Sequence, residues 1–237
     1  MEKKHLNVYI GFDTRNYGQQ LAYEVCRKSI LKHLDKNYEV TIIPLIKSDL
    51  EFQGIFYRSE DSLASTEFTY TRFLVPYLND YQGQAVFCDS DFLWECSVHE
   101  VFNYLGDNAV ACVKHDYTPT NATKMDGLVQ TVYPRKNWSS LMVFNCAHPD
   151  IARLNLENVN EKSPAWLHRM EWTKNIGEIP YQYNYLVEYY QSDDAKVYHF
   201  TEGGPWHPGK ENVQYGDKWL AYLTEEEKDK MWKKTQN

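Results

Sequence analysis

The sequence predicts an α/β fold, a single domain with a mostly parallel central sheet flanked by helices. Three observations favour this class. A strand over residues 6–12, a helix over 19–34 and a strand over 39–45 follow one another, an order typical of parallel strands. A length of 237 residues with 43% hydrophobic residues is enough for one large core. A buried-type strand over 85–88 then ends in two aspartates, and open α/β sheets bind ligands beyond such strand ends.

The expected helices and strands follow from the spacing of apolar residues. Residues 19–34 carry them at helical spacing, whereas 39–45 is rich in β-branched residues. Helical spacing returns over 65–78, ahead of the strand at 85–88. Further short helices are expected over 98–105, 149–156, 165–172 and 183–190, and further strands over 109–113, 140–144 and 197–200.

The remaining segments set the domain organisation. Thr224 and Glu227 have the spacing of a capping box at the start of a charged helix over 224–234. The polar stretch 118–137 is either a functional lid or a solvated insertion. Since no linker, repeat or compositional shift divides the chain, we expect one domain over 1–223 followed by a charged C-terminal helix and tail over 224–237.

Composition excludes several classes of function. A net charge of −8 argues against nucleic-acid binding, which requires a basic face. The sequence contains no run of about 18 apolar residues, so we expect no membrane span. The charged start of the chain runs straight into a strand, so we expect no signal peptide. The 15% of aromatic residues includes 19 tyrosines, which suit either sugar and base binding or a tyrosine-rich core.

The five cysteines are widely spaced and include no close pair, which disfavours a zinc knuckle. Cys88, Cys112 and Cys146 lie in apolar runs and are expected to be buried free thiols. Free thiols are typical of a reducing compartment, so we expect a cytoplasmic location.

Asp89 and Asp91 are the strongest candidates for a functional site. In an extended chain, residues i and i+2 point the same way, so both carboxylates can aim at one point past the strand end. Two hard oxygen ligands suit Mg²⁺ or Mn²⁺, which in turn can hold a diphosphate. The alternative is a pair of solvated turn aspartates, since Asp-x-Asp also occurs by chance.

His199 and Arg72 are the candidate partners of this pair. His199 ends the last expected strand and precedes Gly203 and Gly204, whose amides could approach an anion closely. The guanidinium of Arg72 could donate two hydrogen bonds to a phosphate or a sugar hydroxyl. The plainer alternatives are a structural histidine and an ordinary arginine on a helix surface.

The order of these motifs along the chain resembles that of a known family. Asp13 and Tyr17 come first, then the run 70–72, then Asp89-Ser90-Asp91, and finally His199 ahead of 203–206. This order resembles the retaining, glycogenin-like glycosyltransferases of family 8, which have the GT-A (Rossmann-like) fold. The resemblance spans about residues 8–206.

The resemblance implies a role for each motif. Asp89, Asp91 and His199 would hold Mn²⁺ (or Mg²⁺) against the diphosphate of a nucleotide-sugar donor, with a UDP-sugar as the family default. The first strand–helix turn would hold the base and ribose, and Arg72 would touch the donor sugar or phosphate. Gln182 would face the anomeric carbon opposite the leaving group. The implied donor site comprises Gly11, Phe12, Asp13, Tyr17, Tyr70, Arg72, Asp89, Ser90, Asp91, His199, Gly203, Gly204 and Trp206.

The chain departs from the family pattern at three places, which indicates a divergent relative. Tyr181 stands where the family has an acidic residue before its glutamine. Residues 138–140 replace an Asn-Ala-Gly turn. Gly204 stands where the family has a lysine before its Pro-Trp pair, and Lys210 lies beyond the motif. The metal site therefore carries over better than the donor-sugar pocket.

Three other functions remain open. A haloacid dehalogenase-like phosphatase would use Asp89 as nucleophile and could take Asp193-Asp194 as its downstream acidic pair. A non-catalytic nucleotide-sugar binder would keep the fold without turnover. An inverting transferase would need a general base facing the acceptor, for which Asp116 and Glu178 are the candidates. The acceptor would be a hydroxyl group of a glycan, a lipid or a protein.

Overall fold

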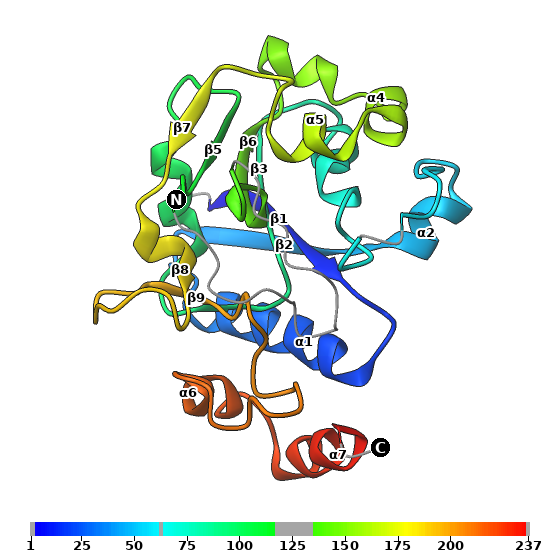
Figure 1. Cartoon of the computed structure of the whole chain (residues 1–237). Helices are drawn as coiled ribbons and strands as arrows, with labels where there is room; N and C mark the ends of the chain where they lie inside the picture. The colour runs from blue at the N-terminus through cyan, green and yellow to red at the C-terminus, as the bar shows by residue number, and fades with distance from the viewer. Residues whose placement is uncertain (1–2, 62–63, 117–134, 236–237) are drawn as a thin grey trace.

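The computed structural model describes residues 3–61, 64–116 and 135–235, and most of the candidate lid segment 118–137 lies outside these ranges (Figure 1). The core of the fold is a six-stranded sheet in which β6 runs antiparallel to both of its neighbours and the other pairs are parallel. In spatial order its strands are β2 (Tyr38–Ile46), β1 (Lys4–Phe12), β3 (Gln84–Cys88), β6 (Leu141–Asn145), β5 (Val110–Cys112) and β7 (Ile176–Glu178).

The opening strand–helix–strand unit forms as expected. β1 and β2 pair in parallel, and α1 (Tyr17–Lys32) crosses between them. Asn16 starts α1 because its side chain accepts the amide N–H of Gln19 at 2.9 Å. The α/β class with a mostly parallel central sheet is therefore confirmed.

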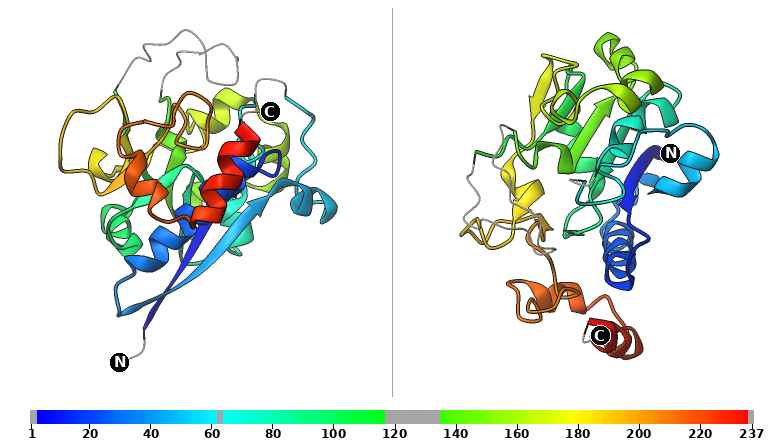
Figure 2. Two further views of the ribbon diagram at one scale, coloured as in Figure 1. Left: turned by 90° about the horizontal axis from the view of Figure 1, so that it is seen from below. Right: turned by 45° about the vertical axis from the view of Figure 1, so that its right-hand side comes forward.

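The two faces of the sheet are covered by different helices (Figures 1 and 2). Side chains of β1 alternate, so that Val8 and Ile10 pack with Cys26 of α1 while Tyr9 packs on the opposite face. That opposite face is covered by η1 (Thr71–Leu74), α3 (Val75–Leu78), η4 (Pro149–Arg153), α4 (Leu156–Glu161) and α5 (Pro164–His168). α2 (Lys47–Phe52) follows β2 directly and contributes Leu50 to the core on this same face, whereas η2 (Val98–Tyr104) packs on the face that α1 covers.

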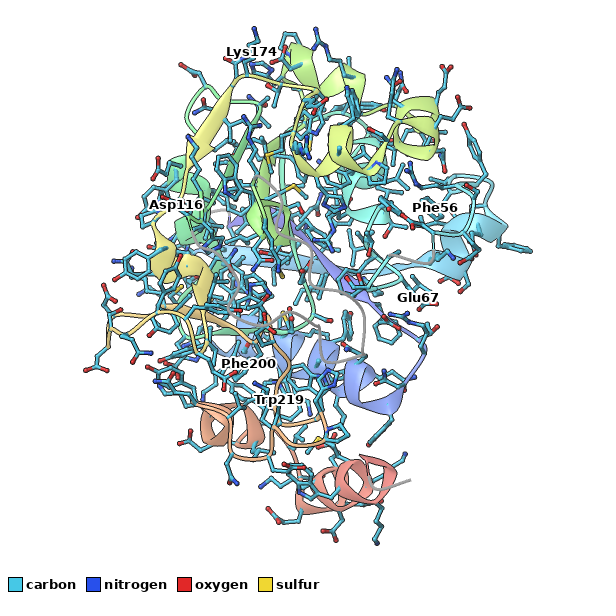
Figure 3. All side chains as sticks on the ribbon, viewed as in Figure 1. Phe56, Glu67, Asp116, Lys174, Phe200 and Trp219 are labelled. Carbon is cyan, nitrogen blue, oxygen red and sulfur yellow. The ribbon has the colours of Figure 1, made fainter. Side chains whose placement is uncertain are left out.

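A second, three-stranded sheet pairs two strands from late in the sequence with a strand that follows β3. Its order is β4 (Phe92–Trp94), β9 (Val197–His199) and β8 (Tyr185–Leu186). Trp219 of α6 (Gly216–Leu220) and Phe200 are buried in one cluster with residues of α1 (Figure 3). α7 (Glu225–Thr235) packs on α1, and the expected capping box is present, since the amide of Thr224 donates to Glu227 Oε2 at 2.7 Å.

Several expected helices differ from the structure. Residues 65–78 form only η1 and α3, and 98–105 and 149–156 form 3₁₀ rather than α turns. The helix expected over 183–190 is wrong, because η5 (Tyr181–Asn184) and β8 occupy this segment. Residues 183–187 are all buried, so their apolar spacing reflects burial on every side and not one face of a helix.

Two compositional expectations can be compared with the described residues. Cys88, Cys112 and Cys146 are buried free thiols, as expected, and Cys26 is a fourth. Among the described residues, no helix combines the length and the apolar composition needed to cross a membrane.

Candidate functional site

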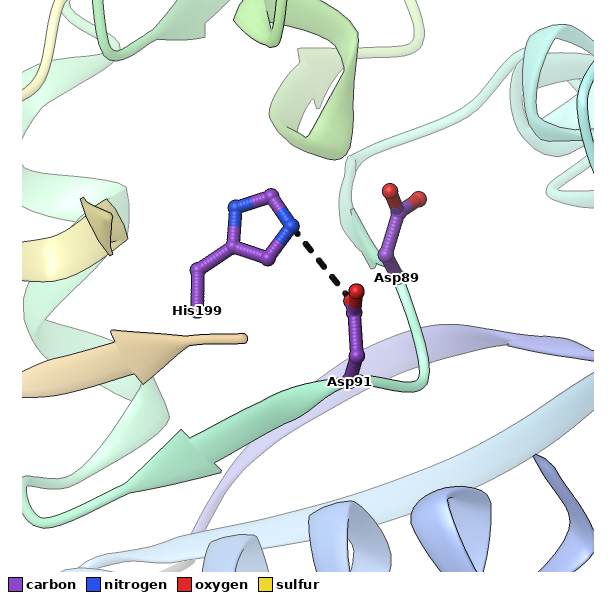
Figure 4. Close-up of side chains that lie close together, drawn as sticks. All are labelled: Asp89, Asp91 and His199. Carbon is purple, nitrogen blue, oxygen red and sulfur yellow. Dashed lines mark ion pairs between the residues drawn. The ribbon is translucent and has the colours of Figure 1, made fainter. Parts of the chain in front are cut away.

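Three side chains that are distant in the sequence converge beyond the carboxyl end of β3 (Figure 4). Asp89 and Asp91 lie in the turn from β3 into β4, and His199 ends β9, which pairs with β4 so that His199 lies opposite Phe92. The Nε2 atom of His199 lies 3.4 Å from Oδ1 of Asp91. One potential ligand atom from each of the three residues lies within 4.8 Å of the others. The sequence predicted this convergence.

The charges and hydrogen bonds of this cluster fit a divalent cation. Oδ1 of Asp91 is buried and accepts no hydrogen bond from the described residues, whereas Oδ1 of Asp89 lies 2.8 Å from Nη1 of Arg72. Burial raises the pKa of Asp89 to about 7, an effect that the Arg72 guanidinium opposes and the Asp91 carboxylate reinforces. Two carboxylates and an imidazole form an anionic donor set. Such a set suits Mn²⁺ or Mg²⁺.

A directional hydrogen-bond chain sets the tautomer of His199. Ser140 Oγ donates to the carbonyl of Asn137 at 2.7 Å, so it accepts from Asn184 Nδ2 at 2.9 Å. The other end of that amide, Asn184 Oδ1, therefore accepts the Nδ1 proton of His199 at 2.8 Å. With Nδ1 protonated, Nε2 carries a lone pair toward Asp91, which is the form that binds a metal.

Arg72 is a buried constituent of this site and not a helix-surface residue. It is 6% exposed, lies in η1, and its Nη1 is 2.8 Å from Oδ1 of Asp89. The same guanidinium donates to the carbonyls of Ser139 (2.9 Å) and Phe68 (3.1 Å) and lies over the ring of Phe87. These contacts hold the Arg72 head group against the Asp89 carboxylate, a candidate metal ligand.

A cavity of about 420 Å³ opens above the cluster, within the range of small-ligand sites. Asp89, Asp91, His199 and Arg72 line it, so the candidate metal site is part of its wall. The other expected donor residues in its lining are Tyr70, Gly203 and Trp206, and residues with no predicted role include Gln19, Ser139, Ser140, His168, Arg169, Thr201 and Glu202.

Trp206 belongs both to the cavity wall and to the core. Its side chain is 3% exposed and packs against Trp219, with ring centroids 4.8 Å apart. Gly203 precedes it with φ 93°, in the region that favours glycine, and its amide donates to the carbonyl of Phe200 at 2.7 Å. That amide is therefore used within the turn. A Cβ atom on Gly204 would lie 2.0 Å from Cζ3 of Trp206, so only glycine fits there.

Replacing Gly204 with alanine should destabilise the protein by about 1–3 kcal/mol, because the buried Trp206 ring has to move. Urea unfolding at equilibrium measures the change. Gly204 does not adopt a positive φ, so the loss reports the clash with Trp206 and not left-handed backbone strain. Trp206→Leu should relieve part of the Gly204→Ala penalty in a double-mutant cycle, and strict additivity of the two would contradict the clash.

Several residues expected at the donor site do not line this cavity. The Phe68 ring covers Gly11, Phe12 packs on Tyr23, and Asp13 accepts the Arg15 guanidinium with Nε–Oδ1 at 2.8 Å. The ring of Tyr17 lies under Lys230 of α7, with 4.4 Å from Nζ to the ring centroid. Ser90 is buried and lies outside the lining, as does Gly204.

A second cavity of about 350 Å³ adjoins the first, since Asp61, Thr66 and Tyr70 line both. Arg15 of the first strand–helix turn lines it, together with Lys47 and further residues of 56–67. The expected base-binding turn therefore borders this second space and not the cavity above the metal cluster.

Of the three expected catalytic residues, Arg72 lines the first cavity, whereas Gln182 and Asp116 lie outside the lining of both, as does Glu178. Gln182 Nε2 donates to Asp194 Oδ2 at 2.8 Å at an exposed position. Asp116 follows β5 and is exposed (Figure 3). Glu178 is 69% exposed and lies 3.8 Å from Lys114.

Asn184 is the site residue that the sequence interpretation missed. It is completely buried and holds His199 through the chain of hydrogen bonds described above. The sequence does contain a signal for Asn184, which is an amide residue between Tyr183 and Tyr185 in a run of aromatic residues. An amide that is buried in such a run requires hydrogen-bond partners, which indicates a structural role.

Comparison with known proteins supports the fold and sets the family. No protein-family model matches the chain. A protein of Arabidopsis thaliana, protein CDI, is 44% identical over 237 residues, which cover 96% of this chain and 90% of that protein. The chain belongs to the CDI family.

The fold of this CDI family member is that of GT-A glycosyltransferases. The bifunctional glycosyltransferase WbbM superposes with a TM-score of 0.62 at 17% identity, over 99% of this chain and 52% of WbbM, so the chain spans about half of that protein. The galactosyltransferase LgtC, solved with donor and acceptor sugar analogues, gives a TM-score of 0.58 at 13% identity over 95% of this chain and all of LgtC. Mouse xyloside xylosyltransferase 1 gives 0.51 at 11% identity, over 83% of this chain and 98% of that protein.

Proposed function

We propose that this protein is a metal-dependent glycosyltransferase that moves a sugar from a nucleoside-diphosphate donor, UDP in the first instance, to a hydroxyl group of a glycan, lipid or protein. One observation carries the proposal. Asp89, Asp91 and His199 converge, with a metal-binding tautomer of the histidine, in the wall of a cavity at the carboxyl edge of a GT-A sheet. The motif order that resembles family 8 supports the same conclusion.

Each part of the site would have a defined task. Asp89, Asp91 and His199 would hold Mn²⁺ or Mg²⁺, and the chemistry that such an ion supplies is Lewis-acid neutralisation of the charge on a departing diphosphate. Arg72 would keep Asp89 oriented and add positive charge beside it. Trp206 and its turn would close one side of the pocket and exclude water.

The nucleoside would extend from the metal toward the second cavity. Arg15, Tyr70 and the first strand–helix turn border that space, which continues from the cavity above Asp89. In this arrangement Asp13 would act by fixing Arg15 and not by contacting the base directly.

Transfer with retention is the outcome that we propose. The two candidate bases for inversion, Asp116 and Glu178, lie outside the cavity lining. In the retaining reaction the acceptor hydroxyl attacks the face that the diphosphate leaves, and the leaving phosphate oxygen takes its proton. Gln182 keeps its proposed role at the anomeric carbon only if its bond to Asp194 breaks when substrates bind.

A phosphatase of the haloacid dehalogenase type has less support. Asp194 is exposed and accepts hydrogen bonds from Tyr181 and Gln182, and neither it nor Asp193 lines the cavity. The second acidic pair of such a phosphatase would thus lie away from Asp89.

Thermal unfolding with UDP, UDP-glucose and Mn²⁺, added singly and together, tests the proposal. We expect a rise in Tm that requires the nucleotide and the metal together, because ligand binding to the native state stabilises it by mass action. Slow Mn²⁺-dependent release of UDP from UDP-glucose would then separate an enzyme from a non-catalytic binder, and NMR of the product anomer would decide between retention and inversion. The absence of any nucleotide- and metal-dependent shift would refute the proposed function.

A further inference from the structure

Arg169 brings a cationic side chain without an anionic partner to the cavity. It lines the space above the metal cluster, and no described carboxylate lies within ion-pair distance of its guanidinium. Its Nε atom is buried and has no hydrogen-bond partner among the described residues. Arg72, the other arginine of the lining, is by contrast paired with Asp89. A buried, unpaired guanidinium donor is costly unless a ligand completes it.

The backbone holds Arg169 rigidly in this position. Arg169 caps α5, and the next two amides close the helix end, Met170 onto Leu167 at 3.0 Å and Glu171 onto Trp166 at 3.0 Å. Met170 adopts φ 52°, a left-handed conformation that is unfavourable for a methionine, and its side chain is fully buried. The position is therefore defined by packing rather than left to a mobile surface loop.

The surroundings of Arg169 add positive charge to an otherwise acidic protein. The Arg135 guanidinium donates to the carbonyl of Arg169, and Lys136 also lines the cavity. The chain as a whole has a net charge of −8, so this cationic edge contrasts with the rest of the molecule.

Arg169 lies on a different wall from the one that would hold the diphosphate. The preceding residue, His168, is joined through Nδ1 to Ser139 Oγ at 2.9 Å, and Ser139 stands between it and Arg72. Arg72 and Ser139 thus connect Asp89 to the end of α5, and no hydrogen bond or ion pair among the described residues joins Arg169 itself to Asp89, Asp91 or His199. In the proposed arrangement a diphosphate at the Asp89–Asp91–His199 cluster leaves Arg169 for a group carried by a sugar.

We propose that Arg169 binds an oxyanion, a carboxylate or a phosphate, carried by one of the two sugars that meet in this cavity, so that the enzyme prefers an anionic sugar substrate. The inference rests on the proposed glycosyltransferase function. A guanidinium presents its donors in a planar fork that matches a carboxylate or phosphate in two-point contact. The group belongs either to the donor sugar or to the acceptor, and a direct test distinguishes these two sources.

The test compares matched neutral and anionic probes by calorimetry in the presence of Mn²⁺. The donor arm uses UDP-glucose and UDP-glucuronic acid, and the acceptor arm uses glucose, glucuronic acid and glucose 6-phosphate with UDP bound. In the wild type we expect an anionic probe of one arm to bind about tenfold or more tightly than its neutral match. Arg169→Gln should abolish this preference, and Arg169→Lys should keep part of it.

The control is Arg153→Gln, which removes the same charge at an exposed position outside the cavity and should leave the preference unchanged. UDP with Mn²⁺ should bind wild type and Arg169→Gln equally. Weaker UDP binding in Arg169→Gln would assign the residue to the diphosphate and overturn the inference, as would equal binding of neutral and anionic probes by the wild type. Failure of the wild type to bind UDP would instead overturn the proposed function together with this inference.

Discussion

Replacing Asp91 with asparagine should abolish metal-dependent nucleotide binding and glycosyl transfer. The substitution preserves the shape of the side chain and removes one of the two negative charges in the cluster with Asp89 and His199. Loss of an outer partner of a metal ligand typically lowers metal affinity about 10–100-fold, so loss of a ligand charge should exceed about 100-fold. Titration calorimetry with Mn²⁺, followed by UDP release from UDP-glucose, measures both effects.

The same substitution should make the metal-free protein more stable. The Asp91 carboxylate contributes to the raised pKa of Asp89, which means that the two charges repel one another in the folded state. Removing that repulsion should raise the free energy of unfolding by on the order of 1 kcal/mol. Asp107→Asn removes an exposed carboxylate outside the cavity and serves as the control. A variant that is less stable without metal yet retains the Mn²⁺ response would contradict the proposed site.

Replacing Asn184 with alanine should weaken metal binding about 10–100-fold without touching a ligand. The Nδ1 proton of His199 would lose its acceptor, so the ring could turn or change tautomer and Nε2 would no longer present a fixed lone pair. A buried donor without a partner should also lower the free energy of unfolding by about 1–3 kcal/mol. Mn²⁺ titration and urea unfolding on the same preparation separate the two losses.

A conservative variant distinguishes positioning from stability. In Asn184→Asp the carboxylate still accepts the Nδ1 proton of His199, whereas the hydrogen bond from Asn184 Nδ2 to Ser140 is lost. Metal affinity should therefore return close to the wild-type value even if stability does not. Asn158→Ala, which deletes an amide that bonds only within its own segment, should change stability alone. Equal metal affinity in Asn184→Ala and the wild type would rule out the role of the hydrogen-bond chain.

The convergence of Asp89, Asp91 and His199 could be predicted from the sequence because each of these residues has a strong local signal. Asp89 and Asp91 follow an apolar strand at a spacing of two, and His199 ends another apolar run. Topology then brings them together, since strand ends meet at one edge of a sheet. The pairing of β4 with β9 supplies the last step.

The remaining site residues depend on contacts that no local pattern reveals. Arg72 has the sequence context of a helix-surface residue, and only the 3₁₀ turn at 71–74 directs it inward to Asp89. Gln182 and Asn184 are both amides in one short segment, and burial, which the sequence does not show, decides that Asn184 faces His199. The helix wrongly expected over 183–190 has the same origin, because a segment buried on all sides has no amphipathic face.

The pairing of β4 with β9 also determines when the site can come into existence. Asp89 and Asp91 leave the ribosome well before His199 and its strand, which lie far downstream in the sequence. Contacts between residues so far apart in the sequence form late in folding, because the long loop between them has to close first and this costs chain entropy. A nascent or truncated chain that ends before β9 would hold Asp89, with Arg72 beside it, and Asp91 but not His199, and so no complete ion site. Binding of Mn²⁺ would therefore report on completed folding, and metal supply should favour the finished protein over its intermediates.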